Sequence, residues 1–341
     1  MRTQLLKADE SSLKLAAELL KDGQVVGIPT ETVYGLGADA LNETAVRAIF
    51  AAKERPADNP LIVHVADFAE LEPLCHVNDM ARKLNEAFWP GPLTMILPKK
   101  DIVPTVVTAG LESVAIRMPA HPVAQRIIRL SGCPIAAPSA NRSGRPSPTQ
   151  AQHVFEDMDG RIPLIIDGGD SDVGVESTVV SLTGDTAVVL RPGGITPEMI
   201  AAVLGTCEVA DSVMRPLREG EEAPSPGMKH KHYAPKAPMT LYAGQTAQVA
   251  RRICAEYDAA KEDGEALILA AHDHLPLYGD RHVFDLGPTA ASAAHALFAA
   301  LRYADTLGVH RVFSEAYPEE GVGMALMNRM ARAAGFDIVH V

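Results

Sequence analysis

The sequence predicts a two-domain α/β protein, and three observations lead to this prediction. Its 341 residues exceed what one domain of ~150 residues usually needs. Segments with strand and helix patterns alternate along most of the chain. Between residues 205 and 238 this periodicity disappears, and the stretch is rich in proline and charge. We therefore expect a first domain over residues 1–204, a linker or lid over 205–238, and a second domain over 239–341.

The elements of the first domain follow from apolar spacing and capping residues. Residues 9–22 carry apolar side chains at helical spacing, and Gly23 suits a C-terminal cap. A helix over residues 44–53 follows Asn42, a favourable N-cap. Further helices are expected over residues 78–88 and 121–131 and after Thr196. Apolar runs of strand length predict strands over residues 24–28, 61–65, 94–97, 113–118, 134–137, 164–166, 177–182 and 187–190.

The second domain shows a simpler alternation. Strands are expected over residues 239–242, 266–270, 283–286 and 310–313. Helices are expected over residues 246–261, 289–306 and 323–334. Strands that alternate with helices of this length indicate a small parallel α/β domain.

Composition narrows the class of protein. Apolar residues make up 47% of the chain and charged residues 22%, which is typical of a globular protein in water. No apolar stretch reaches the ~18 residues of a membrane span, so we expect no membrane association. The four cysteines are widely spaced, which excludes a CxxC zinc or redox motif and suits a reducing cytoplasm. A net charge of −12 argues against a general nucleic-acid binder.

The segment VGIPTETVYGLGADA, residues 26–40, contains the GxGxxA pattern of dinucleotide sites after a predicted strand. Proline and polar residues interrupt the strand before the glycines, and the next helix begins only after Asn42. The usual pyrophosphate-on-helix geometry is therefore weak. We expect instead that Thr30, Glu31 and Thr32 project into a cleft at a strand end. A capped turn without a ligand is the alternative.

The next two polar segments carry cations. In KERPADNPLIVH, residues 53–64, Lys53 and Arg55 stand on a loop stiffened by prolines and suit a polyphosphate clamp. They would also stabilise a helix C-terminus without any ligand. His64, on an apolar strand, is either a core residue or a ligand contact. Arg117, in SVAIRMPAH, needs an anion if buried, either a ligand carboxylate or a structural carboxylate partner.

Two later segments are rich in hydroxyl groups. AAPSANRSGRPSPT, residues 136–149, follows a short buried strand and suits an anion site, although composition alone predicts only a loop. GGDSDVGVESTVV, residues 168–180, precedes a strand that ends at Arg191, and α/β proteins place ligands at such strand ends. The chain has no P-loop, no nucleophile elbow and no histidine spacing of a catalytic metal. Two HxH pairs, at residues 230–232 and 272–274, are expected in exposed loops.

Taken together and in order, these segments resemble the threonylcarbamoyl-AMP synthase family of the YrdC type. The resemblance rests on PTETVYGLG, KERP with NPLIVH, VAIRMPAH, PSAN with PSPT, and GVESTVV with LRPG, over about residues 5–204. SPGMKHKHYAPKAP and the tail to Val341 resemble the long, two-domain form of the family. The resemblance implies a YrdC-like twisted open sheet with a large cavity, followed by a smaller Rossmann-like parallel α/β domain.

The resemblance also implies a nucleotidyltransferase reaction. L-threonine and bicarbonate form a carbamate, which attacks the α-phosphate of ATP to give threonylcarbamoyl-AMP and pyrophosphate. Mg²⁺ would be bound through the triphosphate, with no metal site made of protein side chains. Downstream threonylcarbamoyl-transfer proteins would pass the group to an adenosine beside the tRNA anticodon, as part of tRNA modification.

Site residues follow from matching positions of the family motifs. The resemblance assigns the main catalytic roles to Lys53, Arg55 and Arg117. It assigns threonine binding to Thr32, His64, Arg117, Ala137 and Ser177. It assigns ATP binding to Lys53, Arg55, Asn59, Ser113, Ser139, Asn141, Ser147 and Arg191, with Tyr233 of the linker closing over the nucleotide.

Two other classes of function stay open at this point. The cations could grip an RNA backbone, so an RNA-binding module, or weak RNA binding beside catalysis, is one alternative. A threonine or nucleotide sensor without turnover is the other, because motifs do not establish catalysis.

Overall fold

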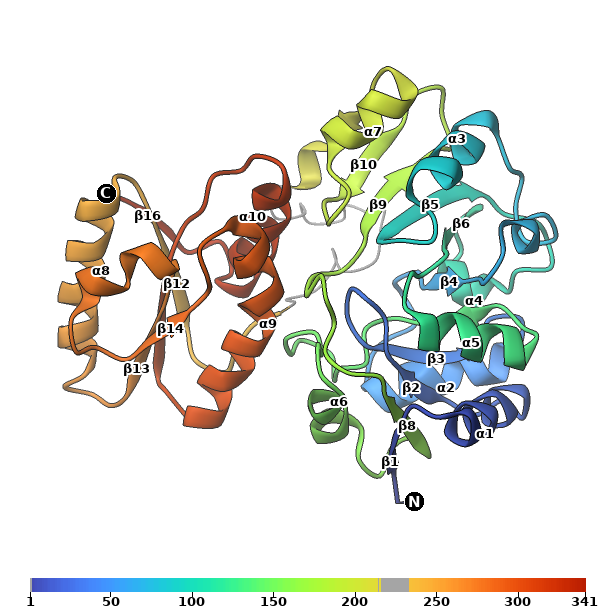
Figure 1. The fold of residues 1–341 in the computed structure, drawn as a ribbon, viewed down its shortest axis with the longest axis horizontal. Coiled ribbons are helices and arrows are strands. Elements are labelled where there is room, and N and C mark those ends of the chain that lie inside the picture. The colour runs from blue at the N-terminus through green and yellow to red at the C-terminus, as the bar shows by residue number, and fades with distance from the viewer. Residues whose placement is uncertain (1, 214, 216–232) are drawn as a thin grey trace. The chain divides into compact units, whose positions relative to one another are not determined.

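The computed structural model describes residues 2–213, 215 and 233–341, which form two compact units (Figure 1). The first unit comprises residues 2–143 and 147–213. The second comprises residues 144–146, 215 and 233–341. Much of the predicted linker, including Lys229 and the HxH pair at 230–232, lies outside the described residues.

Eleven strands form the mixed sheet of the first unit. They are β1 (Gln4–Lys7), β2 (Val26–Ile28), β3 (Gly35–Asp39), β4 (Ile62–His64), β5 (Leu93–Pro98), β6 (Ser113–Arg117), β7 (Ile135–Ala136), β8 (Leu164–Asp167), β9 (Thr178–Ser181), β10 (Val188–Arg191) and β11 (Glu208–Val209). Their order across the sheet is β1-β8-β2-β3-β7-β4-β6-β5-β9-β10-β11. The sheet contains both parallel pairs, such as β4 and β6, and antiparallel pairs, such as β5 and β6.

The helices of this unit begin at residues that satisfy their free N–H groups. Asp9 accepts hydrogen bonds from the backbone of Ser11 and Ser12 at the start of the first helix, and Asn42 accepts one from Ala45 at the start of the second. The helices are α1 (Glu10–Lys21), α2 (Glu43–Lys53), α3 (Asp79–Phe88), α4 (Thr105–Thr108), α5 (Pro122–Ser131), α6 (Ala151–Met158) and α7 (Pro197–Leu204), with 3-10 turns η1 (Phe68–Leu71) and η2 (Asp211–Val213).

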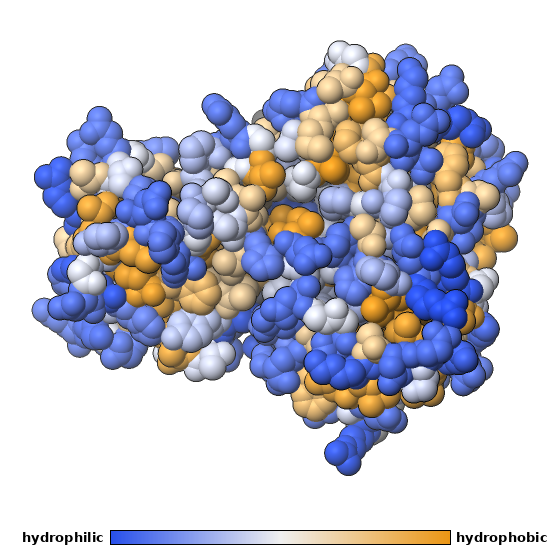
Figure 2. Space-filling view, viewed as in Figure 1, coloured by the Kyte–Doolittle hydropathy of each residue, from blue (hydrophilic) through white to orange (hydrophobic). Residues whose placement is uncertain are grey.

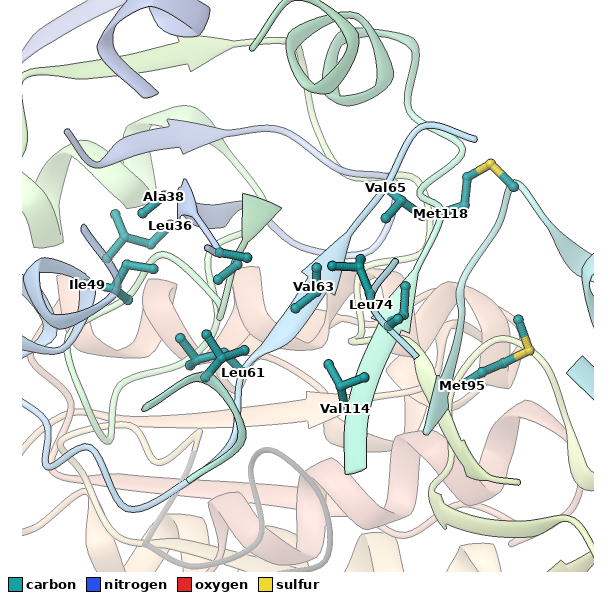
Figure 3. Packing of buried hydrophobic residues seen from close by; sticks show 14 of the residues in the cluster. Leu36, Ala38, Ile49, Leu61, Val63, Val65, Leu74, Met95, Val114 and Met118 are labelled. Carbon is teal, nitrogen blue, oxygen red and sulfur yellow. The ribbon is translucent and has the colours of Figure 1, made fainter. Parts of the chain in front are cut away.

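The main apolar core of the first unit fixes the central strands relative to α2. Figure 3 shows Leu36 of β3, Ile49 of α2, Val63 of β4 and Val114 of β6 in this cluster. All four are essentially inaccessible to solvent. Burial of such side chains stabilises each by about 1.5–3 kcal/mol relative to exposure. This packing fixes the register of β4 and β6, and therefore the position of the polar residues at their ends.

The second unit is a five-stranded parallel sheet with helices along its strands (Figure 1). Its strands are β12 (Met239–Ala243), β13 (Ala266–Ala270), β14 (Val283–Asp285), β15 (Arg311–Glu315) and β16 (Ile338–His340), in the order β14-β13-β15-β12-β16. Its helices are α8 (Thr246–Ala260), α9 (Ala290–Leu307) and α10 (Val322–Ala333), with the 3-10 helix η3 (His272–Tyr278). The predicted α/β class, with a parallel second domain, is confirmed.

Several local differences from the predictions have physical causes. Gly35 and Gly37 lie inside β3 rather than in a phosphate-binding turn, so the dinucleotide alternative is wrong. A Cβ on Gly37 would lie 3.0 Å from the side chain of Ile135, which explains a glycine in this strand. The edge strand β1 and the helix α6 were not predicted, because β1 has only four residues and is largely exposed, and α6 follows a proline-rich loop.

The second HxH pair does not lie in a free loop. His272 and His274 belong to η3, where His272 Nδ1 is 2.7 Å from Asp285 Oδ2 and His274 Nδ1 is 2.8 Å from Glu315 Oε2. The carboxylate of Glu315 is buried, so His274 has a structural partner.

The visible surface is mainly polar. In Figure 2, hydrophilic residues cover much of both units and hydrophobic residues are scattered among them. Among the helices of the described residues, none is long and apolar enough to cross a membrane.

Candidate functional site

Two of the predicted site residues meet at the ends of adjacent parallel strands. His64 ends β4 and Arg117 ends β6, and the two residues are partners in the strand register. Side chains at partner positions point to the same face of a sheet. Both are almost completely buried, with 3% of each residue exposed. The strand register therefore places an imidazole beside a guanidinium in the interior of the first unit.

Arg117 is held by groups from two loops. Its Nη1 donates to Thr32 Oγ1 at 2.7 Å and its Nε donates to the Gly91 carbonyl at 3.2 Å. Its Nη2 lies 2.7 Å from Glu31 Oε1 in a buried ion pair. The structural carboxylate partner expected as one alternative for Arg117 is therefore present. Arg117 also binds Thr32, another predicted threonine contact, so its role as a ligand for the substrate carboxylate stays a prediction.

His64 is neutral in this environment. Its Nδ1 lies 3.2 Å from the Ile62 carbonyl, which can only accept, so Nδ1 donates. Burial and the neighbouring Arg117 lower the pKa of His64 to about 3. An uncharged imidazole at neutral pH can exchange hydrogen bonds with a substrate hydroxyl, but it supplies neither positive charge nor a proton.

A second polar group surrounds Ser177. Arg191 Nη2 donates to Ser177 Oγ at 3.1 Å, and Arg191 Nε donates to the Ser177 carbonyl at 3.1 Å. Thr94 Oγ1 lies 2.7 Å from the same Ser177 hydroxyl. Thr94 and Arg117 are in turn register partners in β5 and β6. The adjacent strands β6, β5 and β9 therefore connect the residue expected to bind threonine carboxylate with one expected to bind phosphate.

A third group forms around Lys53 at the end of α2. Its Nζ donates to the carbonyls of Ser139 and Asn141, the latter at 2.6 Å. Ser139 Oγ donates to Asn141 Oδ1. Ser139 also forms an isolated bridge with Gly35 of β3. Three of the predicted nucleotide contacts thus meet in one cluster, although Lys53 lies more than eighty positions before the other two in sequence.

The loop between α2 and β4 carries the next two predicted contacts. Asn59 is fully buried, and neither its Oδ1 nor its Nδ2 has a hydrogen-bond partner among the described residues. A buried amide without partners costs free energy unless a ligand satisfies it. The Arg55 guanidinium lies 6.0 Å from the centre of the Phe50 ring.

Three further predicted residues occupy separate places in the first unit. Ala137 follows β7 and donates its N–H to the Ile62 carbonyl at 2.9 Å, beside β4. Ser147 Oγ donates to Glu176 Oε1, and both residues are buried. Ser113 begins β6 and lies about 13 Å from Arg117 along this strand, at about 3.3 Å per residue.

Tyr233 belongs to the second unit. It is 4% exposed, its ring centre lies 5.2 Å from that of Phe298, and the Arg329 guanidinium lies 5.8 Å from its ring. Its expected role as a lid over the nucleotide stays a prediction.

Sequence patterns missed two buried residues that contact the predicted set. They are Thr94 beside Ser177 and Glu176 beside Ser147, whereas Glu31, expected at this strand end, pairs with Arg117. Glu176 immediately precedes the predicted contact Ser177, so chain proximity was an available signal. Thr94 had no such signal, because threonine is common in strands.

Within the described ranges, no group of three histidine, cysteine or acidic side chains could hold a metal ion. The predicted nucleotide contacts Lys53, Arg55 and Arg191 instead supply positive charge. Cations with hydroxyl and amide groups suit a polyphosphate, and a buried forked guanidinium suits a carboxylate.

Comparison with known proteins adds independent information. Residues 18–193 match a family model described as "Telomere recombination" (Sua5_yciO_yrdC), and residues 195–335 match "Threonylcarbamoyl-AMP synthase, C-terminal domain". A threonylcarbamoyl-AMP synthase of Pyrococcus abyssi is 46% identical and aligns with 98% of this chain and 97% of its own length. One of Bacillus subtilis is 47% identical, with 99% and 97% covered.

A solved structure gives the same relationship in three dimensions. The crystal structure of P. abyssi Sua5 complexed with L-threonine superposes with a TM-score of 0.93 at 45% sequence identity, covering 99% of this chain and 100% of the other. Full-length similarity in sequence and in fold leads to one conclusion: the chain belongs to the threonylcarbamoyl-AMP synthase family.

Proposed function

We infer that this chain is a threonylcarbamoyl-AMP synthase, a nucleotidyltransferase that uses L-threonine, bicarbonate and ATP. The observation that carries the proposal is the buried Arg117, bound to Thr32 at 2.7 Å and in register with His64. A relative of nearly the same length is known in complex with L-threonine. The carboxylate of threonine would bind Arg117, and its hydroxyl would lie near the neutral His64, with Thr32, Ala137 and Ser177 completing the site.

ATP would occupy the side of the site that carries Lys53, Arg55 and Arg191. These cations would neutralise the triphosphate, and Asn59, Ser139, Asn141 and Ser147 would supply polar contacts. Mg²⁺ would enter as part of the MgATP substrate, bound through oxygens of the triphosphate. Ser113, about 13 Å from Arg117 along β6, would contact a distal part of the nucleotide.

The chemistry has two steps. The threonine nitrogen bonds to the carbon of bicarbonate, and loss of water gives a carbamate. A carbamate oxygen then attacks the α-phosphorus, the bond to the β-phosphate oxygen breaks, and pyrophosphate leaves. His64, with a pKa of about 3, is not a cationic acid at neutral pH. We propose that the side chains act by positioning two reactants and by stabilising charge at phosphorus.

The product is an activated acyl group, so a further reaction must consume it. We propose that partner proteins transfer the threonylcarbamoyl group to an adenosine of tRNA next to the anticodon, in the cytoplasm. We also propose that residues 1–204 form the catalytic domain, with 205–238 as linker and lid and 239–341 as the second domain. Exclusion of water by a lid would protect a labile carbamate and adenylate.

Pyrophosphate release tests the proposal directly. Full-length protein is incubated with MgATP and with threonine and bicarbonate, singly and together. We expect release only when both are present. Release without threonine or without bicarbonate would assign a different substrate. Threonine or ATP binding without release would favour the sensor alternative, and steeply salt-dependent RNA binding without release would favour the RNA-binding alternative.

A further inference from the structure

Glu31 is a buried carboxylate paired with Arg117, the residue proposed to bind the threonine carboxylate. It is 6% exposed, and its Oε1 lies 2.7 Å from Arg117 Nη2 and accepts the Ala120 N–H at 3.0 Å. Its Oε2 is buried and has no hydrogen-bond partner among the described residues. A structural ion pair usually satisfies both oxygens of a buried carboxylate, so this arrangement leaves an acceptor available.

The net charge around Glu31 depends on the protonation of Glu31 itself and of the two histidines near it. Burial favours a raised pKa, but Arg117 and the Ala120 N–H outweigh it, so the pKa of Glu31 lies below its usual value. Burial, the first cause in both cases, lowers the pKa of His64 and of His121, the two histidines whose charge would interact with Glu31. At neutral pH the group therefore contains one cation, Arg117, and one anion, Glu31.

Glu31 is not the only group that orients Arg117. Thr32 and the Gly91 carbonyl already hold two of its three guanidinium nitrogens. Removing the charge of Glu31 without changing its shape would therefore leave the guanidinium largely in place. What would change is the charge that an incoming ligand meets.

We propose that Glu31 is a positioning and selectivity residue that makes this site prefer an amino acid over the same carboxylic acid without its nitrogen. The inference rests on the proposed binding of threonine at Arg117. A simple carboxylate would meet an arginine already neutralised by Glu31 and would be repelled by that carboxylate. A ligand that also carries an amino group would offer donors to the free Oε2 and would compensate its charge.

The test compares L-threonine with (R)-3-hydroxybutanoate, which has the same carbon chain, hydroxyl and carboxylate but no amino group. Equilibrium binding of each is measured at pH 7.5 with wild-type full-length protein and with Glu31→Gln. We expect the affinity of the variant for threonine to fall about tenfold and its affinity for 3-hydroxybutanoate to rise severalfold. A tenfold change in affinity is about what the loss of one charged hydrogen bond produces. The ratio of the two affinities is the readout, because a purely structural role would move both in the same direction.

Two further variants keep the test interpretable. Glu31→Asp retains the charge and should keep the preference for threonine. It replaces Glu31→Gln in the test if Glu31→Gln does not fold. Loss of the preference in Glu31→Asp would overturn the proposal. Glu10→Gln removes a carboxylate that pairs with Arg126 at 2.7 Å in an exposed ion pair, and it should change neither affinity. An unchanged ratio in folded Glu31→Gln would also overturn the proposal.

The failure of this inference differs from failure of the proposed function. If wild-type protein binds threonine and the ratio is insensitive to Glu31→Gln, the synthase proposal stands and only the selectivity role falls. If wild-type protein binds neither ligand and releases no pyrophosphate, the assignment of threonine to Arg117 is wrong and both proposals fall.

Discussion

Arg117 contributes both to the stability of the fold and to the proposed binding of threonine. It is 3% exposed and contacts Thr32, Gly91 and Glu31, which come from two different loops. Burying a guanidinium lowers the stability of the fold little while these partners are present. It lowers the stability strongly when one charged partner is removed. Its surroundings therefore serve stability and ligand binding together, and a substitution should affect both.

Arg117→Ala should weaken threonine binding by about 1.5–3 kcal/mol, the usual contribution of a charged hydrogen bond. It should also lower the free energy of unfolding by about 3–5 kcal/mol, because Glu31 is left as an unpaired buried charge. Calorimetric titration with threonine measures the first effect and urea unfolding the second. Arg126→Ala, at an exposed ion pair, is the control. Unchanged threonine affinity would refute the assigned role.

His64 predicts a pH dependence of stability. Its pKa is about 3 in the folded protein and 6.5 for a histidine in water, so between these values the unfolded chain binds more protons. The stability that His64 contributes is present above pH 6.5 and is lost as pH falls toward 3, by up to about 1.4 kcal/mol per pH unit.

Unfolding free energies of wild-type and His64→Asn proteins between pH 7 and pH 4 measure this contribution. The variant should show a shallower decline with falling pH than the wild type. His340→Asn, at an exposed position, is the matched control. Parallel declines in wild type and His64→Asn would show that His64 does not carry this effect.

At the scale of elements, β9, β10 and the segment after β10 bring Ser177 and Arg191 together. A Cβ on Gly193 would lie 2.3 Å from the Thr178 backbone nitrogen and 2.7 Å from the Glu176 carbonyl oxygen. Backbone atoms cannot rotate away as a side chain can. Close backbone approach, rather than an unusual φ, therefore requires glycine here.

Gly193→Ala should push this segment away from β9 and lower the free energy of unfolding by about 1–3 kcal/mol, as overpacking does. The KM for ATP should rise at the same time, because Arg191 and Ser177 flank this close backbone contact. Gly184→Ala is a matched control, since its added Cβ would meet nothing within 4 Å in the turn between the same two strands. Equal behaviour of the two variants would contradict the role given to this contact.

The elements also show what sequence can and cannot predict. The positions of α1 and α2 were predicted well, because amphipathic spacing and capping residues act locally. The cluster of Lys53 with Ser139 and Asn141 was not predicted as such, because its bonds join positions 86 and 88 residues apart. The sequence offered both a ligand and a structural partner for Arg117, and only the structure shows that Glu31 and Thr32 contact it together.

At the scale of the whole molecule, two units differ in architecture. The first is a mixed sheet, and the second is wholly parallel. The predicted class was confirmed, because alternating strands and helices in the second half leave few topologies. The expected domain limits at residues 204 and 238, and the lid between them, stay predictions, because residues 214 and 216–232 lie outside the described part of the chain.

A fragment of residues 1–213 tests the division of labour between the two parts. It keeps all eleven strands of the first sheet and ends with η2. We expect a folded fragment that releases pyrophosphate much more slowly than the full-length protein, because the proposed lid is missing. Circular dichroism confirms folding and the pyrophosphate assay measures the rate. An equal rate would show that neither residues 214–238 nor the second unit contributes to the rate.

The edges of the large sheet have a consequence for the protein at high concentration. β1 has four residues and ends in Lys7, and β11 at the opposite edge has only two residues, both exposed. Short edge strands are poor templates for pairing with another chain, and a lysine opposes close approach. An eleven-stranded sheet that ends in this way is protected against edge-to-edge aggregation.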